Sequence, residues 1–347
     1  MQYIDKIMAQ KQAQTVGFKP GERNVFFHIL TACNLRCKHC YINTAQHGSA
    51  TLSLTTIERW LKLFSDPSKK SNLILLGGEP TLHPDLAACV ASAKQLGYSV
   101  TVDSNVYLFH DFLEKTDPQQ LDYLSFSLDG PDSDINDPIR GVGVFDICVG
   151  NIRKAIKRGF RVSVIYTVSK NNIDHLHRMI PLLKNLRVER FFIQVIGLRG
   201  ESAKMLPEVL SEHSQSPQVS REKWLEVVPD VAQKAAEQGL HVTYPKVFLD
   251  ESEPFECAGE VAENYFIFPN GRVYQCPLCE DYALHTYTIE NDVLIPNPGL
   301  TEKMMFPLKI EEGCVMNKLL QPDTIEYDSS GKPVSRISCC LIKKEIY

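Results

Sequence analysis

Three cysteines, Cys33, Cys37 and Cys40, lie within eight residues in the stretch TACNLRCKHCY, with the spacing C-x3-C-x2-C. Disulfides use cysteines in pairs, and a structural zinc site takes four ligands. A four-iron cluster is held by cysteine thiolates and normally takes four of them. Three thiolates leave one iron open to an outside ligand, such as the amino and carboxylate groups of an amino acid. The loop therefore favours an open-site iron–sulfur cluster, and the alternative is a zinc site with His39 as fourth ligand.

The composition indicates a cytoplasmic protein with a sizeable core. The chain has 347 residues, of which 44% are hydrophobic and 23% are charged. Its N-terminus, MQYIDKIMAQKQAQ, has no apolar signal region, so its eleven cysteines indicate metal binding or catalysis rather than disulfides. A net charge of -5 without a long basic run argues against nucleic acid as a partner. No apolar run approaches the length of a membrane span, so no membrane partner is expected.

Between residues 24 and 197 the sequence alternates between strand-like and helix-like patterns. Several strand candidates are continuous apolar runs, as expected of parallel strands that are covered on both faces. Cys89 and Cys148 fall inside predicted amphipathic helices, where we expect small core thiols. The predicted strands are 24–30, 72–76, 98–103, 122–128, 160–168 and 189–196, and helices are predicted around 86–93, 145–156 and 176–183, the last with a kink at Pro181.

This alternation predicts an α/β protein with a partial (β/α)6 TIM-like barrel over residues 24–245, after an N-terminal extension of residues 1–23. Repeated strand–helix units give parallel strands with right-handed crossovers. In such folds the chemistry gathers at the C-terminal ends of the strands, and the three-cysteine loop directly follows the first strand. Residues 198–220 are polar and predict a loop or lid, and they are followed by a helix at 221–238 and a strand at 241–245.

The cysteine loop after a first strand resembles that of the radical S-adenosylmethionine (SAM) enzymes, and the resemblance covers most of the chain. The stretch LLGGEPTLHP, which follows the second strand, is similar to the GGEP motif of this family. The resemblance implies that Gly77, Gly78, Glu79 and Pro80 lie at the methionyl amino group of SAM. Two glycines at a strand end allow the backbone to approach a ligand closely.

Three more stretches, DSN, SFSLDGP and INDPIRG, resemble segments of the same family and extend the implied SAM pocket. Asn105 follows the third strand, Ser127 ends the fourth, and Arg140 would pair with the SAM carboxylate. Ile196, at the end of the sixth strand, would lie against the adenine. The alternatives are strand-end capping for Asn105 and Ser127, and a surface salt bridge for Arg140.

The resemblance also implies the chemistry. In the family, an electron reaches the [4Fe-4S] cluster, SAM is cleaved reductively, and a 5′-deoxyadenosyl radical removes a hydrogen atom from the substrate. A flavodoxin- or ferredoxin-type electron donor is then an expected partner. Two rival hypotheses are a non-catalytic iron–sulfur electron carrier and a structural zinc protein.

A second group of cysteines lies beyond residue 245, where we predict a small cysteine-rich α+β domain over residues 246–347. Cys257, Gly271 and Cys276 form a C-x13-G-x4-C pattern, which resembles the start of the SPASM and twitch extensions of radical SAM enzymes. The resemblance implies one auxiliary [4Fe-4S] cluster, with a two-cluster arrangement and a structural zinc site as alternatives. Its expected ligands are Cys257, Cys276, Cys314 and Cys279, with Cys339 or Cys340 as the alternative fourth ligand.

The substrate is the least determined part of this prediction. SPASM and twitch relatives mostly modify peptides or proteins, so we predict a crosslink, an epimerisation or an oxidation of a peptide. The alternative substrate is a small molecule or a cofactor precursor. A cysteine that does not bind iron can return a hydrogen atom to a product radical, and the candidates for this role are Cys279, Cys339 and Cys340.

Overall fold

The computed structural model describes residues 12–19, 21–203, 216–250, 252–320 and 325–347. Its centre is a run of seven parallel strands that follow one another in the sheet in chain order. The six predicted strands are confirmed to within two residues at each end, and the predicted strand at 241–245 is confirmed. The seven strands are β2 (Glu22–His28), β3 (Lys70–Leu76), β4 (Ser99–Ser104), β5 (Tyr123–Ser127), β6 (Val162–Val168), β7 (Arg190–Val195) and β8 (His241–Pro245).

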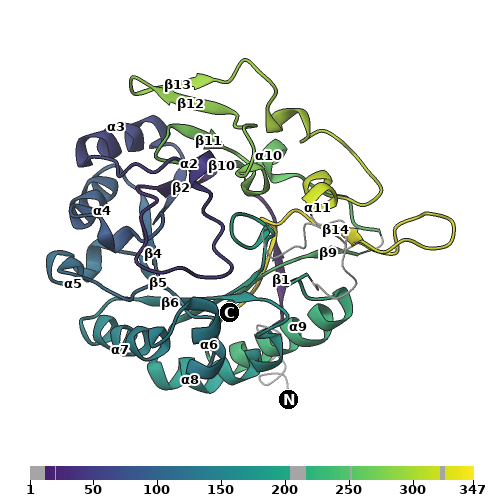
Figure 1. The fold of residues 1–347 in the computed structure, drawn as a ribbon, viewed down its shortest axis with the longest axis horizontal. Helices are drawn as coiled ribbons and strands as arrows, with labels where there is room; N and C mark the ends of the chain where they lie inside the picture. The colour runs from purple at the N-terminus through teal and green to yellow at the C-terminus, as the bar shows by residue number, and fades with distance from the viewer. Residues whose placement is uncertain (1–11, 20, 204–215, 251, 321–324) are drawn as a thin grey trace, which may run out of the picture.

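Helices surround the outer face of this curved sheet (Figure 1). Alternate strand residues such as Val25 and Phe27 are fully buried against them, because successive side chains of a strand point to opposite faces. The predicted helix around 176–183 divides into a 3-10 helix, η4 (Ile173–Arg178), and α8 (Met179–Leu186). Pro181 lies in the first turn of α8, where a missing N–H is tolerated. The other long helices are α3 (Leu54–Phe64), α4 (Leu86–Gln95), α7 (Val144–Lys157) and α9 (Arg221–Glu237).

The sheet continues beyond residue 245 at both of its edges, so it contains more strands than the sequence predicted. β10 (Glu263–Ile267) pairs in parallel with β2, and β15 (Lys343–Ile346) pairs antiparallel with β8. Within the described part of the chain the sheet has thirteen strands, and β1 (Gln14–Val16) and β13 (Val293–Pro296) are its two edges. The α/β class is therefore confirmed, with a mixed and open sheet. β10 and β2 are more than 200 residues apart in the sequence, so no local pattern reveals that they pair.

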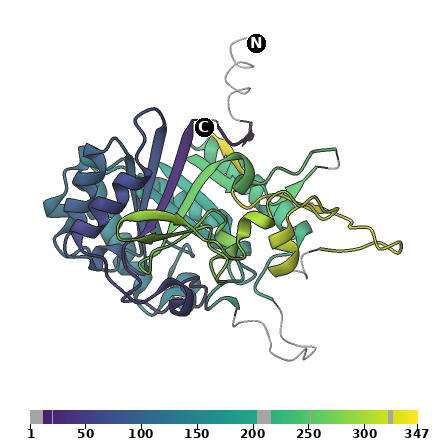
Figure 2. The ribbon, with the colours of Figure 1, turned by 90° about the horizontal axis from the view of Figure 1, so that it is seen from above.

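In the C-terminal segment, α11 (Val315–Leu320) and β14 (Arg336–Ile337) lie on the side away from α3 and α4, whereas β12 (Tyr287–Glu290) and β13 lie close to α3 (Figure 1 and Figure 2). β10 and β11 (Arg272–Tyr274) form a hairpin with its turn at Asn270–Gly271, and Gly271 has a φ of 84°. The remaining elements are α2 (Thr44–His47), α5 (Phe112–Lys115), α6 (Ser133–Arg140), β9 (Phe248–Leu249) and α10 (Ala258–Val261). Among the helices that the structure describes, none is long and apolar enough to span a membrane.

The predicted loop or lid over residues 198–220 falls partly outside the described residues, which exclude 204–215. Its described start packs against the cysteine loop. The amide of Glu201 donates to the carbonyl of Cys40 at 2.7 Å, and a Cβ on Gly200 would lie 2.5 Å from the carbonyl carbon of Tyr41. This part of the segment therefore belongs to the wall of the site.

Candidate functional site

The cysteine loop lies at the C-terminal end of β2, between β2 and α2. Cys33, Cys37 and Cys40 are half-buried and none is in a disulfide. Burial raises the pKa of the Cys33 thiol to about 11, and the charges of Glu79, Cys37 and Cys40 act in the same direction. The three thiols are thus electrostatic neighbours, as a shared cluster requires. His39 is directed elsewhere, because its Nε2 lies 3.2 Å from a carboxylate oxygen of Asp129.

The two glycines of the GGEP motif lie against the backbone segment that leads into the cysteine loop. A Cβ on Gly77 would lie 2.3 Å from the carbonyl oxygen of Leu30, and one on Gly78 would lie 2.2 Å from that of Ala32. The amide of Gly78 donates to Leu30 at 3.0 Å, and the amide of Glu79 donates to Ala32 at 2.9 Å. Only glycine fits at both positions, because the turn lies directly against the backbone of residues 30–32. The predicted approach of these glycines to SAM stays a prediction.

The Glu79 carboxylate holds this turn to the end of the neighbouring strand. It is fully buried and accepts hydrogen bonds from the amide and the hydroxyl of Thr81, at 2.9 and 2.7 Å. It also accepts from the Ser104 hydroxyl at 2.7 Å and from the Asn105 amide at 2.6 Å. Burial raises the pKa of Glu79, and these hydrogen bonds oppose that rise. Pro80 is buried in the same turn, at the first position of a 3-10 helix.

Removal of this carboxylate should destabilise the site strongly. Glu79→Ala leaves three buried donors without their acceptor, the Thr81 amide, the Ser104 hydroxyl and the Asn105 amide, at a cost of about 1–3 kcal/mol for each donor that water does not reach. We expect the midpoint of thermal unfolding to fall by about 5 °C or more. Glu311→Ala, at an exposed acidic position, is the control and should leave the midpoint unchanged. Equal midpoints for the two variants, measured by circular dichroism, would contradict the expected role of Glu79.

Asn105 connects the turn to the first cysteine. Its side-chain nitrogen lies 3.5 Å from the sulfur of Cys33 and donates to the Asn34 side chain at 2.9 Å. Its side-chain oxygen accepts from the Tyr107 amide at 3.0 Å, so the capping alternative also holds. The next residue, Val106, is fully buried with a φ of 49°. A β-branched residue in this conformation is strained, and such strain is typical of functional sites.

Arg140 ends α6 and is buried rather than exposed. Its Nε lies 2.7 Å from the carboxylate of Asp129, and only 6% of the residue is exposed. The alternative of a surface salt bridge is therefore wrong. Burial by itself would raise the pKa of Asp129, but the charges of Arg140 and His39 outweigh it and hold this pKa at about 2. Asp129 is a site residue that the sequence reasoning passed over, although it lies within the quoted SFSLDGP stretch. His39 was considered only as a zinc ligand, and the structure places it beside Asp129 instead.

The remaining predicted pocket residues also lie at strand ends. Ser127 is the last residue of β5, and its carbonyl oxygen lies 3.8 Å from the sulfur of Cys148. Ile196 follows β7 and is buried, with its amide donating to Val168 at 3.1 Å. Cys89 and Cys148 are fully buried in α4 and α7, so their prediction as core thiols is confirmed.

The second cysteine group lines one apolar cavity in the C-terminal segment. Burial raises the pKa of Cys314 to about 12, and the charges of Cys339 and Cys257 add to the rise. A hydrogen bond with Cys279 is the largest cause of the raised pKa of Cys276, followed by burial and by the charges of Cys279 and Cys340. The cysteines that line the cavity are Cys257, Cys276, Cys314, Cys339 and Cys340.

This donor set fits an iron–sulfur cluster held by thiolates in apolar surroundings. Cys339 and Cys340 line the cavity, whereas Cys279 is fully buried and does not line it. Within the described ranges, no three His, Cys, Asp or Glu side chains converge closely enough to hold one metal ion. A four-iron cluster is larger than one ion, so its ligands stand further apart.

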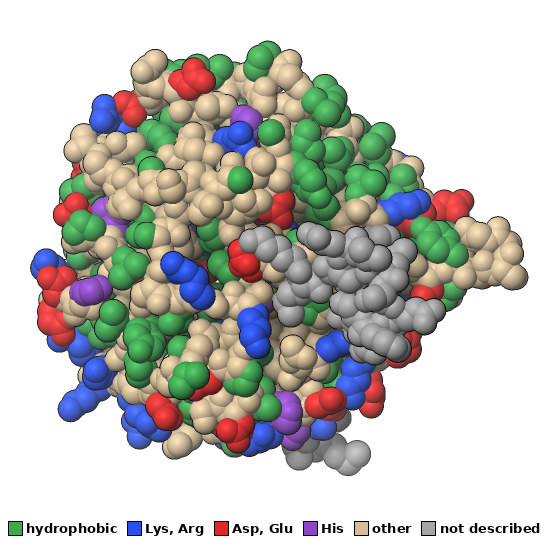
Figure 3. Space-filling model, viewed as in Figure 1, with side chains coloured by type: hydrophobic (Ala, Val, Ile, Leu, Met, Phe, Trp, Pro, Cys, Tyr) green, Lys and Arg blue, Asp and Glu red, His purple; other side chains and the backbone are tan. Residues whose placement is uncertain are grey.

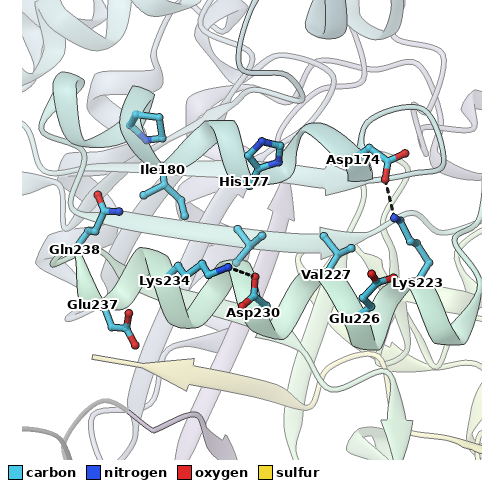
Figure 4. Close-up of a pocket in the computed structure, with 12 residues that line it drawn as sticks. Asp174, His177, Ile180, Lys223, Glu226, Val227, Asp230, Lys234, Glu237 and Gln238 are labelled. Atoms are coloured by element: carbon cyan, nitrogen blue, oxygen red, sulfur yellow. Dashed lines mark hydrogen bonds and ion pairs between the residues drawn. The ribbon is translucent and has the colours of Figure 1, made fainter.

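One hydrophobic surface patch lies near these cysteines, and one groove lies away from them. Figure 3 shows hydrophobic side chains gathered over the region where Figure 1 places α10 and α11. Met304, Leu308 and Leu319 in this segment are each about half exposed. A separate groove of about 590 Å³ lies between η4, α8 and α9 (Figure 4). The Asp174–Lys223 ion pair joins η4 to α9 across it, and the Asp230–Lys234 ion pair lies within α9. No cysteine lines the groove, so it offers nothing to cluster chemistry.

Among curated proteins, the chain is similar to enzymes of different biosynthetic pathways. It is 29% identical over 191 residues to Fe-coproporphyrin III synthase of Methanosarcina barkeri, a match that covers 54% of this chain and 47% of that protein. It is 26% identical over 266 residues to a probable GTP 3′,8-cyclase of Saccharolobus solfataricus, covering 74% of this chain and 83% of that protein. The chain thus spans about half the length of the first of these relatives.

Among solved structures, the fold is similar to that of SuiB from Streptococcus suis. The structure of SuiB bound to S-adenosylmethionine has a TM-score of 0.58 and 13% identity, and the match covers 93% of this chain and 70% of SuiB. The structure bound to the precursor peptide SuiA has a TM-score of 0.58 and 15% identity, with 79% and 62% covered. At these identities the likeness concerns the fold.

The family model that matches the chain is that of the Radical SAM superfamily, over residues 28–183. This range runs from the end of β2 into α8 and contains the cysteine loop, the GGEP turn, Asp129 and Arg140. The superfamily uses a [4Fe-4S] cluster together with SAM, and these are the cofactors of the matched segment. Residues 28–183, which carry the cysteine loop and the GGEP turn, therefore match the model of the Radical SAM superfamily.

Proposed function

We propose that the protein is a radical SAM enzyme whose Cys33, Cys37 and Cys40 hold the SAM cluster, and that it modifies a peptide or protein. When bound, the cluster and SAM supply a 5′-deoxyadenosyl radical, which removes a hydrogen atom from the substrate. The observation that carries the proposal is the link from Cys33 through Asn105 to the buried carboxylate of Glu79. This link brings the loop after β2 and the turn after β3 to one point at the end of β4.

The residues of this site have separable tasks. Gly77 and Gly78 allow the turn after β3 to meet the cysteine loop, and Glu79 fixes the turn to Ser104 and Asn105. Arg140 offers a cation for the carboxylate of SAM, and Ser127 and Ile196 bound the pocket from β5 and β7. The C-terminal cavity, with five cysteines, is proposed to hold one auxiliary [4Fe-4S] cluster of the SPASM or twitch kind.

Peptide modification is supported by the likeness in fold to SuiB, which has been solved with its precursor peptide. The second candidate is an enzyme of cofactor or small-molecule biosynthesis. It is favoured by the match to the probable GTP 3′,8-cyclase, which covers 83% of that relative. A flavodoxin- or ferredoxin-type protein is the proposed electron donor for both.

The experiment begins with protein that is purified and reconstituted without oxygen, and then given SAM and dithionite. Release of 5′-deoxyadenosine, measured by liquid chromatography and mass spectrometry, is the expected result. Short peptides encoded beside the gene, coproporphyrin III and GTP are then added separately. A rise in nucleoside release with one peptide and a mass change in it support peptide modification. A response to GTP or coproporphyrin III only would replace it with the second candidate, and a loaded protein that never releases nucleoside would favour the electron carrier.

A further inference from the structure

Asp129 contacts three elements that lie far apart in the sequence. One oxygen of its carboxylate accepts a hydrogen bond from the Thr167 amide of β6 at 2.7 Å. The other oxygen lies 2.7 Å from Nε of Arg140, at the end of α6, and 3.2 Å from Nε2 of His39, in the cysteine loop. The Asp129 side chain is 1% exposed. One buried carboxylate therefore joins the cysteine loop, α6 and β6.

The backbone of α6 touches the cysteine loop beside this carboxylate. The Lys38 amide donates to the carbonyl of Ile139 at 3.0 Å, and the Cys37 sulfur lies 3.9 Å from the carbonyl oxygen of Arg140. The start of α6 is held as well, because the Asp129 amide donates to the Asn136 side chain at 3.0 Å. The place of Arg140 relative to the three cysteines is thus set by its own helix and by Asp129.

The guanidinium of Arg140 has more N–H donors than its contact with Asp129 uses. A guanidinium carries five N–H donors in a planar fork, and here Nε faces Asp129. Among the residues that the structure describes, neither terminal nitrogen of Arg140 donates a hydrogen bond. A buried guanidinium with unused N–H donors can bind a second carboxylate. A partner that holds Nε also fixes the direction in which the terminal nitrogens point.

We propose that Asp129 is a positioning residue that holds the Arg140 guanidinium at the edge of the cysteine loop, so that its terminal nitrogens receive the carboxylate of SAM. The inference rests on the proposed function, because it takes SAM as the ligand of the cysteine loop. Asp129 also contacts His39, and through this contact it holds the cysteine loop in place. Nothing in the GGEP turn supplies a comparable cation at this end of the loop.

The test separates aiming of the carboxylate from general support of the fold. SAM and decarboxylated SAM, which lacks the carboxylate, are the two probes, and their dissociation constants are measured with the reconstituted holoprotein by equilibrium dialysis. The variants are Asp129→Asn, Arg140→Met and the double variant. Asp134→Asn, at an exposed position of the same helix, is the matched control. Iron content and circular dichroism check that each variant is loaded and folded.

We expect Asp129→Asn to weaken SAM binding by about tenfold or more, which is the effect of one lost charge-assisted hydrogen bond. Binding of decarboxylated SAM should stay within about twofold, because its affinity does not use the Arg140 fork. The double variant should bind SAM no more weakly than Arg140→Met alone, since the two residues act as a unit. Asp134→Asn should behave as wild type.

Equal weakening of both probes by Asp129→Asn would show general support of the fold and overturn the proposal, as would unchanged SAM affinity. If Asp129→Asn does not fold, Asp129→Glu is measured, in which the carboxylate is displaced by one methylene. Its preference for SAM over decarboxylated SAM should also fall, and an unchanged preference would overturn the inference. A loaded wild type that binds neither probe would instead contradict the proposed function.

Discussion

Replacement of Cys33, Cys37 and Cys40 by alanine is expected to abolish SAM cleavage and to remove about four of about eight irons per chain. The three thiols are electrostatic neighbours in one loop, and each is free of disulfides. Without them the proposed SAM cluster has no protein ligands, whereas the C-terminal cavity keeps its five cysteines. Iron, sulfide and 5′-deoxyadenosine are measured on anaerobically reconstituted protein.

Cys89→Ala is the matched control for this experiment. Cys89 is a cysteine that is fully buried in α4 and lies outside both cysteine groups. Its replacement should leave both the iron content and the nucleoside release at wild-type values. If the triple variant kept all of its iron, the loop would not be a cluster site and the proposed function would fail at its first step.

The second prediction concerns the C-terminal cavity and has the next largest effect. Cys314→Ser should lower the iron content from about eight to about four, because a four-iron cluster that loses one thiolate is not retained. Cys279→Ser should keep all of the iron, since Cys279 does not line the cavity. Because metal binding contributes to folding, Cys314→Ser should also unfold at a lower temperature than wild type.

Single replacements of Cys339 and Cys340 complete this series, because adjacent cysteines rarely bind one metal together. We expect one of the two variants to lose the auxiliary iron and the other to keep it. The thiol that is not needed for iron then remains the candidate hydrogen donor. Loss of iron from Cys279→Ser, with retention in both Cys339→Ser and Cys340→Ser, would contradict the ligand set that the cavity favours.

The sequence by itself determined the central strands and the two motifs on which the proposed chemistry rests. The C-x3-C-x2-C loop directly follows one apolar strand, and the GGEP motif directly follows the next strand. Both are local patterns, so they can be recognised without knowledge of the tertiary contacts. The seven parallel strands could be predicted for the same reason, because their apolar runs and the intervening helices repeat along the chain. The core placement of Cys89 and Cys148 also followed from helical periodicity.

Only the tertiary structure decided which of these residues meet. The parallel pairing of β10 with β2 joins Glu263 to Arg23, and no pattern within either segment encodes that pairing. The role of Asp129 was hidden for the same reason, since its partners His39, Arg140 and Thr167 come from three separate elements. The choice among six C-terminal cysteines likewise depends on which side chains face one cavity. Local sequence specifies local backbone, whereas a buried charge finds its partners only when the strands that carry them are placed side by side.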